Sequence, residues 1–534
     1  MDACLSVDEI VRLIAYELVG SRAKATAVAL ACCRKTFEDP VLDALWETQE
    51  KLLPLLKSLP GDVWNESGCT VSGSTTRFPH SLNRSTRKTF ERLPTALEWV
   101  RFRKYARRMR RLGGLGVLNV LSPEVSSVLQ LCAIDEPLFP RIKTLDLLWP
   151  AKDSIPFIPL FLSPRTTTIS IKFSSPNLSK AIVASMIATF PKLCPDLRCI
   201  DLDTLRDDPT ITAAVSAMLL TTNRNTLRRF RVDSSLTEEA REVVYTLPNL
   251  RAFWAVIRRD TPLPSVILPN LTDLTITYEQ DSDWLQLFRG ATLGPLVAVT
   301  FHSESEQIGD LLEAFERVAL AASVQNTLST FILYTSCSWN PNYPSLHQFT
   351  RMTRLIIEFS CNDGCSSTVD DDVIMNLARA MPKLKILKLG NPPCHEISTG
   401  VTTRGLVVLA HHCPDLFSLR VHFRVASLEV PPTVSGMAPN AGSGVPRRIC
   451  ALKVLEVGEI PVPEESELIV ALTLAQIFPH ISNVDCEDEN WFTVVAAIVV
   501  SKKKIDRSSK EHPLSAPRSD FNGTSIGAAL GDGT

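Results

Sequence analysis

Histidine and cysteine side chains stand together at two points of the sequence, where metal binding is the first chemistry to weigh. His395 follows Cys394, and His411 and His412 precede Cys413. Neither set has the ligand spacing of a zinc site, and no Cys-x-x-Cys occurs in the chain. Two histidines at a helix end also complement the negative pole of its dipole. We therefore expect no metal site here.

Acidic residues are concentrated at Asp207-Asp208 and at residues 370–372. Carboxylates in such groups can hold a cation, but both groups stand where a helix is expected to begin. There, acidic side chains accept hydrogen bonds from free N–H groups and offset the helix dipole. The chain also lacks a Gly-x-Ser-x-Gly elbow, a phosphate-binding loop and a dinucleotide fingerprint. We predict that the protein is not an enzyme and has no catalytic residue and no cofactor.

Composition narrows the class of protein further. Hydrophobic residues make up 45% of the 534 residues, charged residues 21%, and the net charge is −2. These values favour a folded chain and argue against nucleic acid or a membrane as partner. The apolar run at residues 491–500 is too short to span a bilayer. Cysteines without a pairing pattern fit a reducing compartment, so we expect a cytoplasmic or nuclear protein, or both.

A short motif recurs from residue 138 onward: an apolar residue, two variable residues, an apolar residue, one variable residue and an apolar residue. Clear copies are centred on Leu145, Ile200, Phe230, Leu274, Leu387, Leu419 and Leu455, and weaker copies on Ile169, Phe253, Val299, Phe331, Leu355 and Val484. Their spacing of about 28 residues is at the long end for leucine-rich repeats. A proline often stands two residues before the first apolar position, where it stops an incoming helix.

This repeat predicts an α/β leucine-rich-repeat solenoid, a horseshoe over residues 138–500. Short parallel strands would line the concave face and helices would cover the convex face. We expect one such helix to bury Val373, Ile374, Leu377 and Met381, and another to bury Leu468, Ile469, Leu472, Ile477 and Phe478. A Pro/Gly-rich stretch at residues 431–447 indicates an inserted loop. Residues 501–534 are polar and are predicted to be a disordered tail.

The segment before the repeats divides in two. Residues 4–47 predict three short helices, the third opened by Asp39-Pro40. Residues 48–137 predict a helical linker and N-terminal cap, with a flexible loop at residues 65–88. A capping box of Thr95 and Glu98 opens a helix through Leu112 that carries a run of arginines. That run suggests a nuclear import signal, a phosphate-binding face or a solvated face of the cap. We favour the cap, because the apolar stripe continues along the run.

Residues 4–47 resemble an F-box, in the form found in large families of fungal F-box proteins with C-terminal leucine-rich repeats. The resemblance rests on the opening Leu5-Ser-Val-Asp-Glu-Ile10 and on the ending Asp39-Pro40 … Leu45-Trp46, which is its most specific part. Trp99, Tyr105 and the Cys-Pro-Asp-Leu repeats at 194 and 413 resemble the later parts of the same families. Val7 departs from the pattern, because a proline usually stands there.

The resemblance implies a substrate-recognition subunit of an SCF-type cullin–RING ubiquitin ligase. The F-box would dock on the Skp-family adaptor, and through it on cullin, while the solenoid binds a target protein. The adaptor-binding residues would be Leu5, Val7, Ile10, Ile14, Leu18, Val28, Cys32, Leu45 and Trp46. The alternative is a repeat scaffold without ligase coupling.

Residues between the apolar positions of the motif should point outward onto the concave face. Many of them are basic although the chain is slightly acidic, and converging like charges favour an anionic partner. We therefore hypothesise an acidic or phosphorylated substrate. Its contacts would be Arg229, Arg231, Lys385, Lys388 and Arg420.

Overall fold

The structure is a computed structural model of the full chain. It describes residues 8–65, 89–115, 118, 121–133, 136–173, 178–203, 208–257, 267–278, 292–303, 315, 324–335, 344–359, 369–390, 401–423, 425, 449–458, 460, 462–486 and 490–511.

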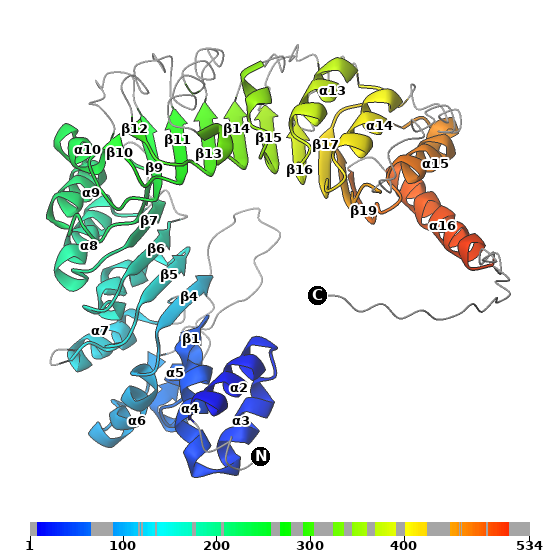
Figure 1. Ribbon diagram of the computed structural model, residues 1–534. Helices are drawn as coiled ribbons and strands as arrows, with labels where there is room; N and C mark the ends of the chain where they lie inside the picture. Colours follow the sequence, from blue (N-terminus) through cyan, green and yellow to red (C-terminus); the bar gives the residue numbers. More distant parts are fainter. Residues whose placement is uncertain are drawn as a thin grey trace, which may run out of the picture.

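A curved sheet of 15 parallel strands forms the body of the protein (Figure 1). Every copy of the repeat motif predicted from the sequence is a strand of this sheet, and each strand pairs with the strand of the next copy. In spatial order the strands are β1 (Thr48–Gln49), β4 (Arg111–Leu115), β5 (Thr144–Leu148), β6 (Thr168–Lys172), β7 (Cys199–Asp203), β8 (Arg229–Val232), β9 (Ala252–Ile257), β11 (Asp273–Tyr278), β13 (Ala298–Ser303), β14 (Thr330–Thr335), β15 (Arg354–Phe359), β16 (Ile386–Leu389), β17 (Ser418–Val421), β18 (Val454–Gly458) and β19 (Asn483–Cys486).

The sheet begins earlier than the sequence predicts. β1 and β4 precede β5, so the predicted boundary at residue 138 is wrong. The expected helix through Leu112 ends at Ala106, and the chain then enters β4. β4 departs from the motif at Gly114, which pairs with the apolar Leu147, and the preceding Gly113 lies directly against Asp146, where a Cβ on the glycine would be only 2.8 Å from the carbonyl oxygen of the aspartate. Glycine permits that close approach of two strands.

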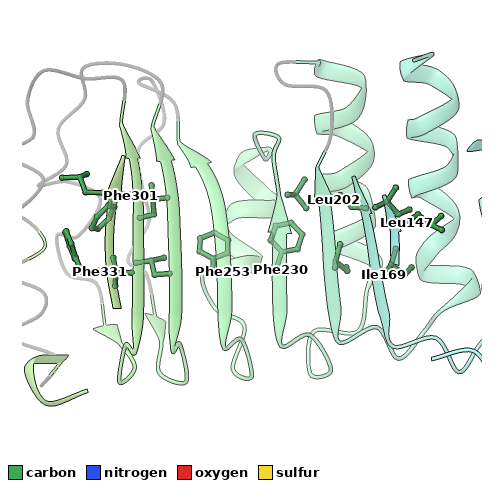
Figure 2. Close-up of a cluster of buried hydrophobic side chains, with 14 of the residues drawn as sticks. Leu147, Ile169, Leu202, Phe230, Phe253, Phe301 and Phe331 are labelled. Carbon is green, nitrogen blue, oxygen red and sulfur yellow. The ribbon is translucent and has the colours of Figure 1, made fainter. Parts of the chain in front are cut away.

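Alternate side chains of each strand are buried between the sheet and the convex layer. In β5, β6 and β7 the second and fourth residues are buried, as expected for one apolar face. The strands pair in register, so these positions form continuous apolar rows across the sheet. Figure 2 shows parts of these rows, including Ile169, Phe230, Phe253 and Phe331. Burying each such side chain contributes about 2 kcal/mol, and no repeat could do so without its neighbours.

Helices and short 3₁₀ segments alternate with the strands along the chain, and the helices lie on the outer side of the arc and at its C-terminal end (Figure 1). They are α7 (Pro123–Cys132), η2 (Lys152–Phe161), α8 (Lys180–Leu193), α9 (Pro209–Thr221), α10 (Glu238–Val244), η3 (Val324–Asn326), η4 (Pro344–Gln348), α13 (Asp371–Ala380), α14 (Thr403–His412), η7 (Glu464–Ser466), α15 (Glu467–Ile477) and α16 (Asn490–Glu511). Two small pairs, β2 (Trp64–Asn65) with β3 (Thr89–Phe90) and β10 (Ile267–Leu268) with β12 (Thr292–Leu293), lie outside the main sheet. No helix in these ranges is long and apolar enough to cross a membrane.

The buried face predicted for α13 is confirmed, whereas the one predicted for α15 is only partly correct. In α13, Val373, Ile374, Leu377 and the following Met381 are buried as predicted. In α15 the prediction is wrong for Leu468, Ile469 and Leu472, which are exposed while Val470, Ala471, Thr473, Leu474 and Ala475 are buried. At the end of the helix, Phe478 is buried as predicted and Ile477 packs against the core. That helix is apolar on all sides, so its periodicity cannot say which side meets the sheet.

Three helices precede the sheet: α2 (Asp8–Gly20), α3 (Lys24–Cys33) and α4 (Lys35–Glu47). They enclose a small apolar core of their own, separate from that of the sheet. The helix α4 begins at Lys35 and contains Pro40, so the predicted start at Asp39-Pro40 is wrong. The short helix α5 (Leu53–Leu56) and α6 (Ala96–Ala106) follow and join the main core. The capping box of Thr95 and Glu98 at the start of α6 is confirmed.

Three predicted segments fall wholly or partly outside the described residues. The loop at 65–88 does so except for its first residue, which ends β2, and the inserted loop at 431–447 does so entirely. The tail predicted from residue 501 starts too early, because α16 continues to Glu511. The N-terminal half of α16 is anchored by buried Trp491, Val494 and Ile498. Residues 501–511 include lysine, arginine and glutamate, residue types that extend a helix at little cost.

The buried rows predict a severe effect of charge at a strand position. Leu387 in β16 and Leu419 in β17 are register partners, and both are fully buried. We expect Leu387→Asp or Leu419→Asp to cost more than about 4 kcal/mol, because the carboxylate would be buried without a partner. Thermal unfolding followed by circular dichroism measures the loss. The exposed control Lys385→Asp should melt like the parent, and parental melting of the leucine variants would contradict this register.

Candidate functional site

The three-helix module leaves large apolar side chains in solvent. On α2, Val11 and Ala15 are buried, whereas Leu13 is 69% and Ile14 39% exposed. On α3, Val28 is 50% exposed. Cys32, one helical turn after Val28, is also exposed. A module of this size has too little interior to bury all of its apolar residues. We call Leu13, Ile14, Val28 and Cys32 the outer apolar residues.

The structure divides the residues predicted to bind an adaptor. Ile14, Val28 and Cys32 are exposed, and Ile10 is half-buried. Leu18 and Leu45 pack against the core of the module. Leu5 and Val7 lie outside the described residues. The prediction missed Leu13, which neighbours Ile14 on α2. Leu13 belongs to the same helical repeat of apolar residues as Ile10, Ile14 and Leu18, so this repeat could have indicated it.

Trp46 has a different place from the one predicted. Its ring stacks on that of Tyr105, at the end of α6, with 4.7 Å between the centroids. Trp46 packs against the main core rather than the core of the module. It therefore joins the module to the solenoid instead of facing a partner.

The arginine run ties the module to the rest of the chain. Arg108 forms ion pairs with both Asp39 and Asp43 of α4. Lys104 pairs with Glu38, with 3.0 Å between nitrogen and oxygen. We call these ion pairs, together with the stacking of Trp46 on Tyr105, the clamp.

Two further ion pairs belong to the same stretch. Arg110 pairs with Glu47 at 3.4 Å, and Arg107 pairs with Glu136 at 2.8 Å. On the inner side of α6, Phe102 and Ala106 are buried. This is the arrangement expected of a cap whose outer face is neutralised by acidic neighbours. A free phosphate-binding face would leave these cations unpaired.

The basic residues expected on the concave face are neutralised by acidic residues toward the C-terminal end of the sheet. Lys388 and Arg420 are register partners in β16 and β17, and both donate to the carboxylate of Glu456 in β18. Arg420 also pairs with Glu358 of β15 at 3.0 Å. These four residues form a network with no net charge. The prediction that these basic residues lie together without acidic partners is wrong here. Glu358, which follows the last apolar residue of its motif, also points to the concave face and pairs with Arg420.

Arg231 is also engaged. Its guanidinium carbon lies 3.6 Å from the ring centroid of Trp254, a cation–π contact, and its Nε lies 3.6 Å from a carboxylate oxygen of Asp201. The indole N–H of Trp254 donates to Thr277 at 2.9 Å. His302 stacks on Tyr334, with 4.7 Å between ring centroids. This aromatic row was not predicted from the sequence, although its members occupy the outward positions of the motif.

The five predicted substrate contacts do not form one patch. Arg229 and Arg231 belong to β8, whereas Lys388 and Arg420 belong to β16 and β17, with five strands between. At about 4.8 Å a strand the two groups are roughly 30 Å apart. Arg229 and Lys385 are exposed at the edge where the strands begin. Those two remain candidates for contact with an anionic partner.

The described members of the histidine, cysteine and aspartate groups considered as metal ligands lie at helix ends. Asp208 caps α9 by accepting from the N–H of Thr210. Asp370 caps α13, and Asp371 accepts from Thr402 at the start of α14. Burial raises the pKa of Cys413 to about 12. His395, Cys394 and Asp207 lie outside the described residues. Within the described ranges, no three His, Cys, Asp or Glu side chains come together as a metal site would require.

Comparison with known proteins does not assign the chain to a family. No family model matches the sequence, and no curated protein matches it. Among solved structures, the chain resembles one in the crystal structure of the Rad7 and Elc1 complex in yeast, with 14% sequence identity and a TM-score of 0.30. The likeness covers 56% of this chain and 77% of that chain. At that TM-score it supports no statement about function.

Two concave carboxylates have pKa values shifted in opposite directions. Burial raises the pKa of Glu456, but the hydrogen bond from Lys388 and the charge of Arg420 outweigh it, so the pKa lies below its ordinary value. Burial raises the pKa of Asp201, and the charge of Arg231 offsets it only in part. The ionised form of Glu456 is therefore stabilised by folding, and that of Asp201 is disfavoured.

These shifts predict opposite effects of two isosteric variants. At about pH 7, Glu456→Gln should lower the free energy of unfolding by about 2 kcal/mol, and Asp201→Asn should leave it unchanged or raise it. The contribution of Glu456 is complete above its unfolded-state pKa and is lost as the pH falls through its lower folded-state pKa. The penalty from Asp201 is complete above its raised folded-state pKa and disappears at lower pH. Urea unfolding between about pH 7 and about pH 3 measures both, and equal pH profiles for the two variants would contradict the assignment.

Proposed function

We propose that this protein is the substrate-recognition subunit of an SCF-type cullin–RING ubiquitin ligase. The three-helix module would be an F-box that docks on the Skp-family adaptor, and through it on cullin. The solenoid would be a leucine-rich-repeat domain that holds a target protein. The observation that carries the proposal is the set of outer apolar residues, on a module whose sequence resembles an F-box.

Exposed Leu13, Ile14 and Val28 suit a helix-to-helix contact with another protein. Burying three such side chains in an interface contributes several kcal/mol, which is the scale of a hot spot. Their surroundings include Arg12 and Glu17, so the apolar centre has a polar rim, as specific interfaces do.

The clamp adds a second reason. A ligase receptor acts by holding its target within reach of a ubiquitin-loaded enzyme, so the distance between its two binding faces matters more than any chemical group. Ring stacking between α4 and α6, and the ion pairs between α4 and Arg108, which follows α6, restrict that geometry. A flexible tether would give a lower effective concentration of the target.

The alternative function is a leucine-rich-repeat scaffold without ligase coupling. It is favoured by Val7, which stands where the F-box pattern has a proline. Co-purification with the Skp-family adaptor separates the two functions, because a scaffold has no use for that partner.

We expect Leu13→Asp combined with Ile14→Asp to weaken adaptor binding by more than about a hundredfold, since two apolar contacts would be replaced by charges. Both residues are exposed, so the fold should persist, which thermal melting checks. Binding is measured by co-purification and by titration of the purified adaptor against the full chain.

The matched controls are Leu97→Asp on α6 and Leu468→Asp on α15, whose leucines are 83% and 61% exposed. They add a charge at exposed leucines outside the module and should bind the adaptor like the parent. Unchanged adaptor recovery with the double variant would overturn the F-box assignment and leave the scaffold.

A further inference from the structure

Three arginines occupy equivalent places in consecutive repeats, at the edge of the sheet where the strands begin. The backbone N–H of Arg228 donates to the carbonyl of Arg198 at 2.8 Å, and the N–H of Arg251 donates to the carbonyl of Arg228 at 2.7 Å. The row extends backward, since Arg198 donates to Thr167 and Thr167 to Lys143. These bonds place the residues on neighbouring strands, about 4.8 Å apart. We call Lys143, Arg198, Arg228 and Arg251 the basic edge.

The cations of the basic edge differ from those of the concave face. All four are exposed. Within the described part of the chain none of them forms an ion pair, whereas Lys388, Arg420 and Arg231 each do. The described residues of the turns that lead into these strands add three exposed cations, Arg141, Arg165 and Arg224, and two exposed acids, Asp196 and Glu136. Glu136 is paired with Arg107.

Like charges on adjacent strands are unfavourable unless an anion offsets them. The chain as a whole has a net charge of −2, so this concentration of positive charge is a local feature. The strands β5 to β9 form one limb of the arc (Figure 1), which gives the row a continuous course along that limb. Charge complementarity therefore points to an extended anionic partner.

We propose that the basic edge binds an extended peptide segment that carries closely spaced anionic side chains, either carboxylates or phosphoryl groups. The inference rests on the proposed function, in which this segment belongs to the target protein. An extended peptide places alternate side chains about 6.6 Å apart, so several acidic groups reach the row at once. Arginine is well suited to both anions because its guanidinium donates two parallel hydrogen bonds.

A peptide fits better than nucleic acid. Proteins that bind single strands present aromatic side chains on which bases stack, and the basic edge and its intervening Thr167 contain none. A single row of cations can follow one phosphate backbone of a duplex, but the net charge of −2 disfavours nucleic acid as a partner. Duplex DNA is therefore the competitor that tests the choice of partner.

The test uses the purified full chain and fluorescence anisotropy with three labelled probes: a poly-glutamate peptide, a Gly/Ser peptide with three phosphoserines, and a poly-glutamine peptide of equal length. We expect one or both anionic probes to bind, more weakly as salt is raised, and the glutamine probe not to bind. The two anionic probes distinguish carboxylate from phosphoryl recognition. Arg198→Glu with Arg228→Glu and Arg251→Glu should weaken binding by at least about tenfold.

The matched control is Lys192→Glu with Arg379→Glu and Arg404→Glu, which changes the charge equally at exposed positions on α8, α13 and α14. An equal loss of anionic-probe binding in both triple variants overturns the proposal, because probe binding would then depend only on the net charge of the chain. Failure of both anionic probes to bind the parent, or their displacement by a trace of duplex DNA, also overturns it. If the glutamate triple variant does not fold, the glutamine triple variant at the same positions gives the same comparison.

Adaptor recovery is measured on the same preparations. If the parent chain binds the anionic peptides but does not bind the adaptor, the proposed function is refuted and the basic edge remains an anion site. Intact adaptor binding with no effect of the arginine substitutions would refute the basic edge and leave the proposed function.

Discussion

The structure depends on the pairing of each strand with the next in one parallel register. A strand of four to six residues with one apolar face cannot bury that face by itself, so each repeat relies on both neighbours. This constraint makes the two ends of the sheet the vulnerable places, because each end presents an unpaired edge. At the N-terminal end β1 is the edge strand, and α4 runs directly into it. At the C-terminal end α16 packs beside β19, and its Trp491 is fully buried and donates to the carbonyl of Ile460.

The same stacking governs the charges on the concave face. Side chains of adjacent strands lie within reach of one another, so a cation that looks isolated in its own repeat meets acids from others. Arg420 illustrates this, since Glu358 precedes it in sequence by two repeats and Glu456 follows it by one. The result is a neutral and partly buried network. Among the described residues, the cations of the basic edge at the beginning of β5 to β9 form no ion pair, so positive charge is left unbalanced along that edge.

The clamp links the two binding functions that we propose. Asp39 and Asp43 belong to α4, whose preceding neighbours α2 and α3 carry the outer apolar residues. Their partner Arg108 follows α6 and precedes β4, the second strand of the sheet. A partner bound to the module is thus held at a defined place relative to the sheet. The ion pairs of the clamp are partly exposed, so their contribution to stability is modest, about 1 kcal/mol for each exposed pair, and their main effect is on orientation.

The sequence by itself determined the strands of the main sheet from β5 onward, because alternating apolar residues with a repeated motif specify one buried face per strand. It also determined the inward residues of α13 and the capping of α6, which are local patterns. Tertiary structure decided what local patterns cannot contain. β4 was missed because Gly114 stands where the motif has its last apolar residue, and α15 was misoriented because it is apolar on every side. Trp46 faces Tyr105 rather than solvent, and Lys388 shares Glu456 with Arg420, because those contacts join residues that are distant in sequence. Which side of a strand is buried is a local property, whereas the partner of a charge or ring depends on how the repeats stack.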